Sequence, residues 1–146
     1  MRLTGHYDHT LDDKGRLAIP AKFRDRLGDT VILTVSDGMY ILGYPLSEWE
    51  SLEEGWTNLS ATREDDAEFL RIIYSQAVDC EIDKQGRILL PARLRDYAQI
   101  KDNVVIAGVG RWLEIWSREN WQVEQARLAE NKKLIVQRMG DKGVKL

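Results

Sequence analysis

Two stretches of this chain, LDDKGRLAIPAKFRD at residues 11–25 and IDKQGRILLPARLRD at residues 82–96, are copies of one another at a constant offset of 71 positions. Seven of the fifteen aligned positions are identical. With two small gaps the similarity continues through TVILTVSDGMYILGYPLSEW and NVVIAGVGRWLEIWSRENW, which place Trp49 over Trp121. A repeat of this length indicates that both halves of the chain encode the same supersecondary unit.

Both copies contain the pattern Asp-x-x-Gly-Arg followed by an apolar run, which is typical of a turn that leads into a buried strand. The glycine of such a turn is free to take a positive φ, and the aspartate can cap the turn through the backbone. The arginine is therefore expected at the mouth of the turn. The residues concerned are Asp12, Gly15 and Arg16 in the first copy and Asp83, Gly86 and Arg87 in the second.

After the turn, each copy predicts a short strand, a short helix that begins at a proline, and a β-hairpin. In the first copy these elements are expected at residues 17–19, 20–27 and 31–44, and in the second at 88–90, 91–98 and 104–116. Helical patterns also follow each copy. We expect a single domain over 1–146, with repeats at 5–49 and 77–121, a helical connection at 50–76, and a C-terminal helix and tail at 122–146.

Charge is unevenly distributed along the chain. The formal net charge is −3, which by itself argues against a nucleic-acid partner, because phosphate binding requires clustered cations. Residues 47–68, however, contain eight acidic residues and one arginine, a net −7, so the rest of the chain carries +4. This segregation fits a basic face and equally a solvated acidic helix, and charge alone leaves DNA binding open.

Composition places the chain in an ordinary class. With 43% hydrophobic and 31% charged residues it should fold as a globular protein. The single cysteine, Cys80, excludes an internal disulfide and lies in an apolar alternation that favours a buried side chain. Because the start of the chain has no apolar signal core and no apolar run reaches membrane length, we expect a cytoplasmic protein with no membrane partner.

The sequence offers little support for catalysis or metal binding. On a strand His6 and Asp8 would face one side and His9 the other, so they do not converge on a metal. Adjacent acids such as Asp12 and Asp13 do not converge as a general acid and base, and no glycine-rich phosphate-binding motif is present. We expect no enzyme activity, no cofactor and no metal.

The segments DDKGRLAIPAKFR and DKQGRILLPARLR resemble the half-barrel motif of AbrB-type (SpoVT-AbrB) DNA-binding proteins, and two in tandem, continuing to about Trp121, resemble the MraZ family. The resemblance implies an α+β, mainly β fold, in which the two repeats of one chain complete a swapped-hairpin AbrB-like β-barrel with flanking helices. It also implies a nucleoid-associated transcription factor that assembles as a ring-shaped homo-oligomer. Such a protein would bind short direct repeats in double-stranded promoter DNA and regulate the division and cell-wall gene cluster.

The resemblance also assigns roles to individual residues. The motif arginines point at DNA in the family, although a structural ion pair with the motif aspartates would account for them as well. A second arginine of the motif contacts DNA in some relatives, or else only solvates the helix. The candidate DNA-binding residues are Arg16, Arg87, Lys14, Arg24, Arg95, Lys22 and Arg93, and the supporting residues are Asp12, Asp83, Gly15 and Gly86. Because Gln85 aligns with Lys14, we expect two unequal half-sites.

Two other functions stay open. AbrB-like barrels also occur in antitoxins that bind a protein, so an antitoxin-like or scaffold interaction module is one alternative, with the acidic segment 47–68 as its docking surface. A purely structural oligomer is the other, and it predicts no salt-sensitive binding to nucleic acid. The five tryptophans are expected in the core or at subunit contacts rather than stacked on single-stranded bases.

Overall fold

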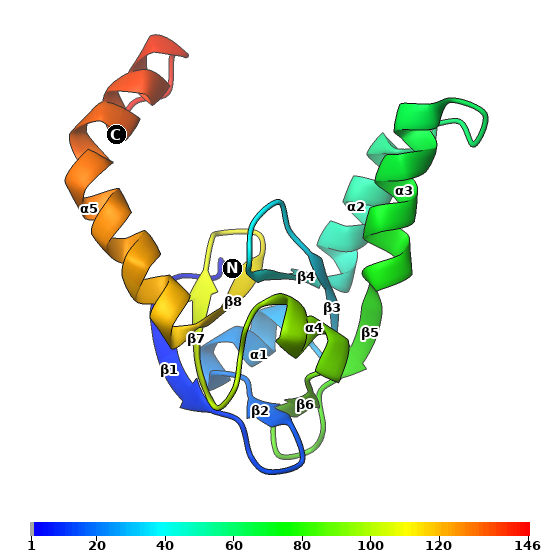
Figure 1. Cartoon of the computed structure of the whole chain (residues 1–146), viewed down its shortest axis with the longest axis vertical. Coiled ribbons are helices and arrows are strands. Elements are labelled where there is room, and N and C mark those ends of the chain that lie inside the picture. The colour runs from blue at the N-terminus through cyan, green and yellow to red at the C-terminus, as the bar shows by residue number, and fades with distance from the viewer. Residues whose placement is uncertain (1) are drawn as a thin grey trace.

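The two sequence repeats build two sets of matching elements in the computed structural model, which describes residues 2–146 (Figure 1). The first set is β1 (His6–Thr10), β2 (Arg16–Ala18), α1 (Ala21–Leu27), β3 (Thr30–Val35), β4 (Ile41–Pro45) and α2 (Leu46–Gly55). The second set is β5 (Val78–Glu81), β6 (Arg87–Leu89), α4 (Ala92–Tyr97), β7 (Asn103–Gly108), β8 (Leu113–Ser117) and α5 (Arg118–Asp141). Between them lies α3 (Glu64–Gln76).

The strands of the two repeats are interleaved. A six-stranded antiparallel sheet has the order β1-β7-β8-β4-β3-β5, which reads the same when the repeats are exchanged. The first strand of each repeat pairs with the other repeat, β1 with β7 and β5 with β3. β2 and β6 pair with each other in a separate two-stranded ribbon. Neither repeat can therefore form its sheet alone.

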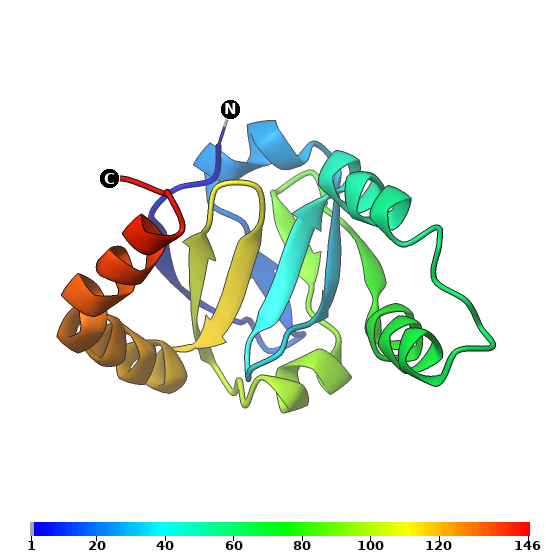
Figure 2. The ribbon, with the colours of Figure 1, turned by 90° about the horizontal axis from the view of Figure 1, so that it is seen from above.

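The α+β class predicted from the sequence is confirmed, but the predicted barrel is not closed. β1 and β5 each pair along one side only and form opposite edges of an open six-stranded sheet (Figure 2). The chain leaves this sheet after each edge strand, and the following strands pair with one another instead of closing it. The single short ladder between β2 and β6 thus takes the place of a pairing that would close the barrel.

The predicted helices and hairpins are present, with small shifts at their starts. The expected strands at 17–19 and 88–90 begin and end one residue earlier, because the next backbone N–H bonds to the opposite turn: Ile19 N donates to Gly86 O at 2.8 Å. Pro20 and Pro91 were predicted as first helical residues. Each is instead the N-cap, since its ψ of 133° or 140° is extended.

One hydrophobic core joins both repeats. On the inner face of the ribbon Leu17 and Ile88 lie opposite each other in register and are buried. Phe23 of α1 and Leu94 of α4, which are equivalent in the repeat, belong to the same buried cluster. Cys80 is also buried, as predicted, and burial raises the pKa of its thiol to about 11. The ribbon is thus anchored by its apolar face, and its other face is left to solvent.

Two helical arms extend from the end of the molecule opposite the ribbon (Figure 1). α5 forms one arm, and α2 with α3 forms the other on the far side, as the view from above also shows (Figure 2). The acidic segment 47–68 lies on α2, on α3 and in the loop between them. Negative charge is therefore separated from the ribbon in space as well as in sequence. No helix within residues 2–146 combines the length and the apolar character that crossing a bilayer would require.

Candidate nucleic-acid interface

The outer face of the β2–β6 ribbon carries both motif arginines. In the antiparallel register Arg16 lies opposite Leu89 and Ala18 opposite Arg87. Because side chains alternate along a strand, these four project from the face opposite the buried Leu17–Ile88 pair. The side chains of Arg16 and Arg87 are 33% and 29% exposed. The ribbon thus presents two guanidinium groups side by side at one end of the molecule.

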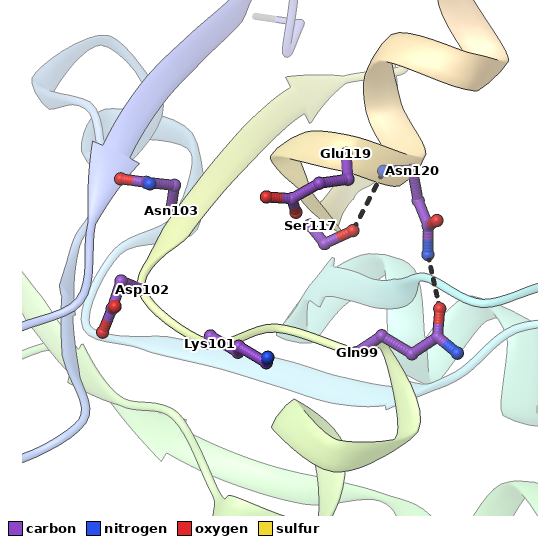
Figure 3. A pocket seen from close by; sticks show the side chains of 7 residues that line it. All are labelled: Gln99, Lys101, Asp102, Asn103, Ser117, Glu119 and Asn120. Carbon is purple, nitrogen blue, oxygen red and sulfur yellow. Dashed lines mark hydrogen bonds between the residues drawn. The ribbon is translucent and has the colours of Figure 1, made fainter.

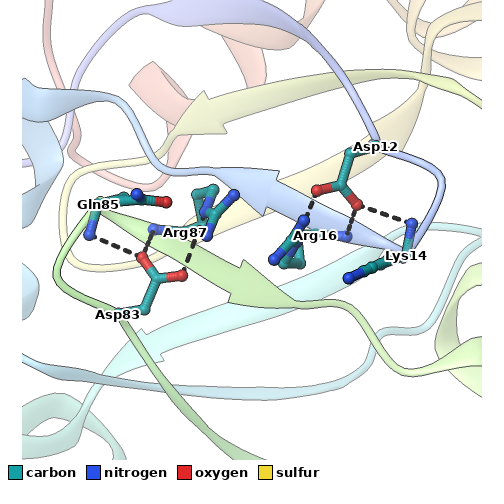
Figure 4. A network of polar contacts seen from close by, with 6 residues as sticks. All are labelled: Asp12, Lys14, Arg16, Asp83, Gln85 and Arg87. Atoms are coloured by element: carbon teal, nitrogen blue, oxygen red, sulfur yellow. Dashed lines mark hydrogen bonds and ion pairs between the residues drawn. The ribbon is translucent and has the colours of Figure 1, made fainter.

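In the first turn the carboxylate of Asp12 holds three donors (Figure 4). Its Oδ1 accepts hydrogen bonds from the backbone N–H groups of Lys14 at 2.9 Å and of Arg16 at 2.8 Å. Its Oδ2 accepts one from Arg16 Nε at 2.6 Å. Gly15, with φ of +79°, lets the chain reverse here, and its N–H donates to Asp12 O at 3.0 Å. One side chain therefore fixes both the turn and the arginine.

The second turn repeats this geometry almost atom for atom. Asp83 Oδ1 accepts from the backbone N–H groups of Gln85 and Arg87, both at 2.9 Å, and Oδ2 accepts from Arg87 Nε at 3.1 Å (Figure 4). Gly86 has the same φ of +79°. The supporting roles that the sequence predicts for the aspartates and glycines in folding the turn agree with these contacts.

These hydrogen bonds act on the ionisation of the two aspartates. The backbone N–H of Arg16 and the Arg16 side chain hold the pKa of Asp12 below its usual value, and those of Arg87 do the same for Asp83. Both carboxylates are therefore ionised at neutral pH. Each aspartate accepts a hydrogen bond from the Nε of its arginine. Within residues 2–146 no hydrogen bond occupies the two terminal nitrogens of either guanidinium. The ion pair and an outward-facing arginine are thus compatible.

The second motif arginines pack across the repeat boundary. Arg24 of the first repeat lies against Gly86 of the second, and Arg95 lies against Gly15. Arg24 Nε donates to the carbonyl of Ile19 at 3.0 Å. Arg95 Nε is buried, and the described residues offer it no hydrogen-bond acceptor. Both side chains therefore support the opposite turn, a role that the aligned sequence does not reveal.

The other predicted cations are exposed near the ribbon. Lys14 is in the first turn, and Lys22 and Arg93 are on the outer surfaces of α1 and α4. Sequence alignment missed one cation, Lys84, because it precedes Gln85 and so faces Asp13 in the alignment. Each turn therefore carries one lysine, Lys14 in the first and Lys84 in the second, at positions that differ by one residue in the alignment. Counting the charges in each turn would have identified Lys84.

A polar hollow of about 410 Å³ lies away from the ribbon, between the end of α4 and the start of α5 (Figure 3). Three of its polar residues are engaged with one another: Asn120 Nδ2 donates to Gln99 Oε1 at 3.0 Å, and Ser117 Oγ accepts from Asn120 N at 3.1 Å as the cap of α5. The residues that line it are Gln99, Lys101, Asp102, Asn103, Ser117, Glu119 and Asn120. These contacts join the start of α5 to the end of β8 and to the segment that follows α4.

Comparison with known proteins places the repeat in a family. A family model described as "MraZ protein, putative antitoxin-like" matches the chain twice, at residues 3–72 and 73–141. The chain is 45% identical to the transcriptional regulator MraZ of Caldicellulosiruptor saccharolyticus, over 97% of this chain and 99% of that one. It is 48% identical to the MraZ of Limosilactobacillus reuteri, over 88% and 91% of the two chains.

A third relative, the transcriptional regulator MraZ of Pelotomaculum thermopropionicum, is 42% identical over 94% of both chains. Each of these similarities extends over nearly the whole length, and the family match falls once on each repeat. The chain therefore belongs to the MraZ family, a family of transcriptional regulators and not of enzymes.

Proposed function

We propose that this chain binds double-stranded DNA through the outer face of the β2–β6 ribbon and regulates transcription by doing so. The observation that carries the proposal is the pair Arg16 and Arg87, which project side by side from an exposed ribbon while two aspartates fix their Nε atoms. A two-stranded ribbon has the width of the major groove, and arginine is the side chain best suited to guanine edges and phosphates.

The aspartates orient these arginines rather than contact DNA. A carboxylate that faced a phosphate would repel it, whereas one that holds Nε leaves the terminal nitrogens free for a bidentate contact. Lys14, Lys22, Lys84 and Arg93 would add contacts to the phosphate backbone around the ribbon. Arg24 and Arg95 act indirectly, because they support the turns from which the motif arginines project.

The finer targets follow from the family resemblance. We infer that the DNA is a set of short direct repeats upstream of the division and cell-wall gene cluster, including this protein's own gene, and that the protein is associated with the nucleoid. Direct repeats suit an assembly whose subunits are related by rotation and present identical ribbons in sequence along one duplex. Several weak contacts on one assembly can raise the apparent affinity by about 10² to 10⁴.

The helical arms support a ring-shaped homo-oligomer. α5 buries none of its residues, and Val123, Leu134 and Val136 are exposed on it. On the other arm Phe69 and Ile72 of α3 are exposed just after the acidic segment 47–68. Because the two arms are different surfaces on opposite sides of the molecule, a contact between α5 of one copy and α3 of the next is heterologous. Such contacts close into a ring when the rotation from copy to copy is a whole fraction of a turn.

The proposal is tested by fluorescence anisotropy with a labelled duplex from upstream of this protein's own gene, titrated at several salt concentrations. We expect preferential binding over a scrambled duplex, with an affinity that falls steeply with salt as counterions are released. Equal affinity for both duplexes would reduce the role to coating of DNA. Absence of binding at low salt would contradict the proposal and favour the protein-interaction alternative.

A further inference from the structure

An exposed leucine interrupts the cationic face of the ribbon. Leu89 on β6 is 61% exposed and lies directly opposite Arg16 in the β2–β6 register. Its neighbours in the chain, Ile88 and Leu90, are both buried, so the strand is anchored without it. This large apolar side chain lies beside Arg16 on the face proposed to bind DNA, so a duplex bound there would remove it from water.

The repeat makes this leucine a point of difference between two similar half-sites. At the offset of 71 residues its counterpart is Ala18, which lies opposite Arg87. The turns, aspartates and arginines recur in both repeats with the same hydrogen bonds. On the ribbon's outer face, therefore, one arginine has a long apolar partner and the other has only a methyl group.

We propose that Leu89 contacts the C5-methyl group of a thymine in the major groove, next to the base or phosphate contacted by Arg16. This inference rests on the proposed DNA-binding function. Among the four bases only thymine presents an apolar group in the major groove, and an aliphatic side chain has nothing to donate to or accept from the other base edges. Ala18 is too short to make the same contact, so thymine is selected beside Arg16 and not beside Arg87.

The expected size of the effect follows from the burial of one methyl group. Removing one such group from water changes an equilibrium constant by about fourfold. The protein therefore prefers a thymine over a uracil at this position by about that factor for each ribbon engaged. Uracil differs from thymine only in lacking the methyl group, so this exchange isolates the contact from hydrogen bonding.

The experiment compares two duplexes from upstream of this protein's own gene. One contains thymidine throughout, and in the other deoxyuridine replaces every thymidine. Binding by the parent chain, Leu89→Ala and Met39→Ala is measured by anisotropy. Met39, 55% exposed in the β3–β4 turn, provides a matched loss of an exposed apolar side chain away from the ribbon. We expect a thymidine preference of about fourfold or more in the parent and in Met39→Ala, and a ratio near one in Leu89→Ala.

Three results would overturn the inference. The first is the same thymidine preference in Leu89→Ala as in the parent. The second is an equal loss of affinity on both duplexes, which would mean that Leu89 packs on the sugar or that the ribbon is disturbed. The third is a parent that binds both duplexes equally well, which would leave the proposed function intact, whereas a parent that binds neither would remove both.

The reverse substitution provides an independent test on a second variant. Ala18→Leu places the longer side chain beside Arg87, so the thymidine preference should rise further, by up to another fourfold where a thymine lies within reach. A preference unchanged from the parent on duplexes in which each base near the site has been varied in turn would count against the inference. Thermal unfolding of each variant verifies that the ribbon is folded.

Discussion

The guanidinium of Arg24, on the first repeat, occupies the space beside Gly86 in the turn of the second, where a Cβ at that glycine would overlap with it. The equivalent contact, between Arg95 and Gly15, is looser: there a Cβ would lie 3.3 Å from Cζ. Each of the two motif turns is thus shaped by a side chain from the other repeat. The two turns should consequently fold and unfold in one cooperative transition.

Gly86→Ala is expected to destabilise the protein more than Gly15→Ala. Both substitutions place a Cβ at a positive φ, which costs about 1–2 kcal/mol. At position 86 the Cβ also displaces Arg24 and breaks its hydrogen bond to the carbonyl of Ile19, which adds about 1.5 kcal/mol. Free energies of unfolding from urea titrations measure the difference.

A double-mutant cycle tests the mechanism behind that difference. Arg24→Ala removes the group with which the new Cβ collides, so the double variant Gly86→Ala with Arg24→Ala should lose less stability than the two single losses added together. Strict additivity would mean that the contact between Arg24 and Gly86 does not set the cost. Arg24→Ala in the Gly15→Ala background serves as the control and should be additive.

Asp12→Asn and Asp83→Asn together should weaken specific DNA binding although they make the protein more positive. The amide oxygen can keep the backbone N–H groups, but the amide nitrogen then faces Arg16 Nε or Arg87 Nε, donor against donor. The loss of one orienting charge-assisted hydrogen bond is worth about tenfold in affinity. Tighter specific binding in anisotropy titrations would show that charge alone determines affinity.

The same two aspartates make stability depend on pH in the acid range. Their folded pKa values lie below the ordinary value of 3.8, so the unfolded chain binds protons first as the pH falls. Their stabilising contribution is complete above about pH 3.8 and is lost as the pH falls through the folded pKa values. The free energy of unfolding should therefore drop less steeply below pH 3.8 in the double Asn variant. Parallel curves for parent and variant would contradict this.

The sequence predicted the parts of this fold that short-range patterns encode. The hairpins, the short helices and the turn geometry at Asp12 and Asp83 follow from residues within a few positions of one another. The open sheet was not predicted, because the pairing of β1 with β7 and of β5 with β3 joins residues about a hundred or fifty positions apart. Nothing in the local pattern distinguishes such partners.

In the candidate site, too, the short-range features were predicted from the sequence and the long-range contacts were not. Placing Arg16 and Arg87 at the mouths of two turns required only the motif, and the structure brings them onto one face because the repeats pair through β2 and β6. The contacts of Arg24 and Arg95 with the opposite glycines could not be inferred, since helix periodicity makes them look like solvated surface residues. The apolar run at 88–90 was predicted to be a buried strand, but its middle residue, Leu89, is exposed, because β6 pairs with β2 in a ribbon that buries only one face.

The arms should control assembly without touching the ribbon. Ile72→Asp on α3 and Leu134→Asp on α5 place a charge in each half of the proposed heterologous contact, and either should reduce the mass seen by analytical ultracentrifugation to that of smaller species. Val144→Asp, 52% exposed beyond the end of α5, is the matched control and should assemble as the parent does. An unchanged mass in both arm variants would refute this interface.

The most direct test compares two double variants that remove the same charge, one from the ribbon and one from a surface away from it. Arg16→Ala with Arg87→Ala removes both motif arginines, whereas Arg2→Ala with Arg111→Ala removes two exposed arginines, one of them in the β7–β8 turn, away from the ribbon (Figure 1). Each base-reading arginine is worth about 1–3 kcal/mol, so the ribbon variant should lose at least a hundredfold in affinity for the specific duplex. The Arg2 and Arg111 variant should bind nearly as the parent does. Equal affinities for the two double variants would show that DNA, if bound, is bound elsewhere.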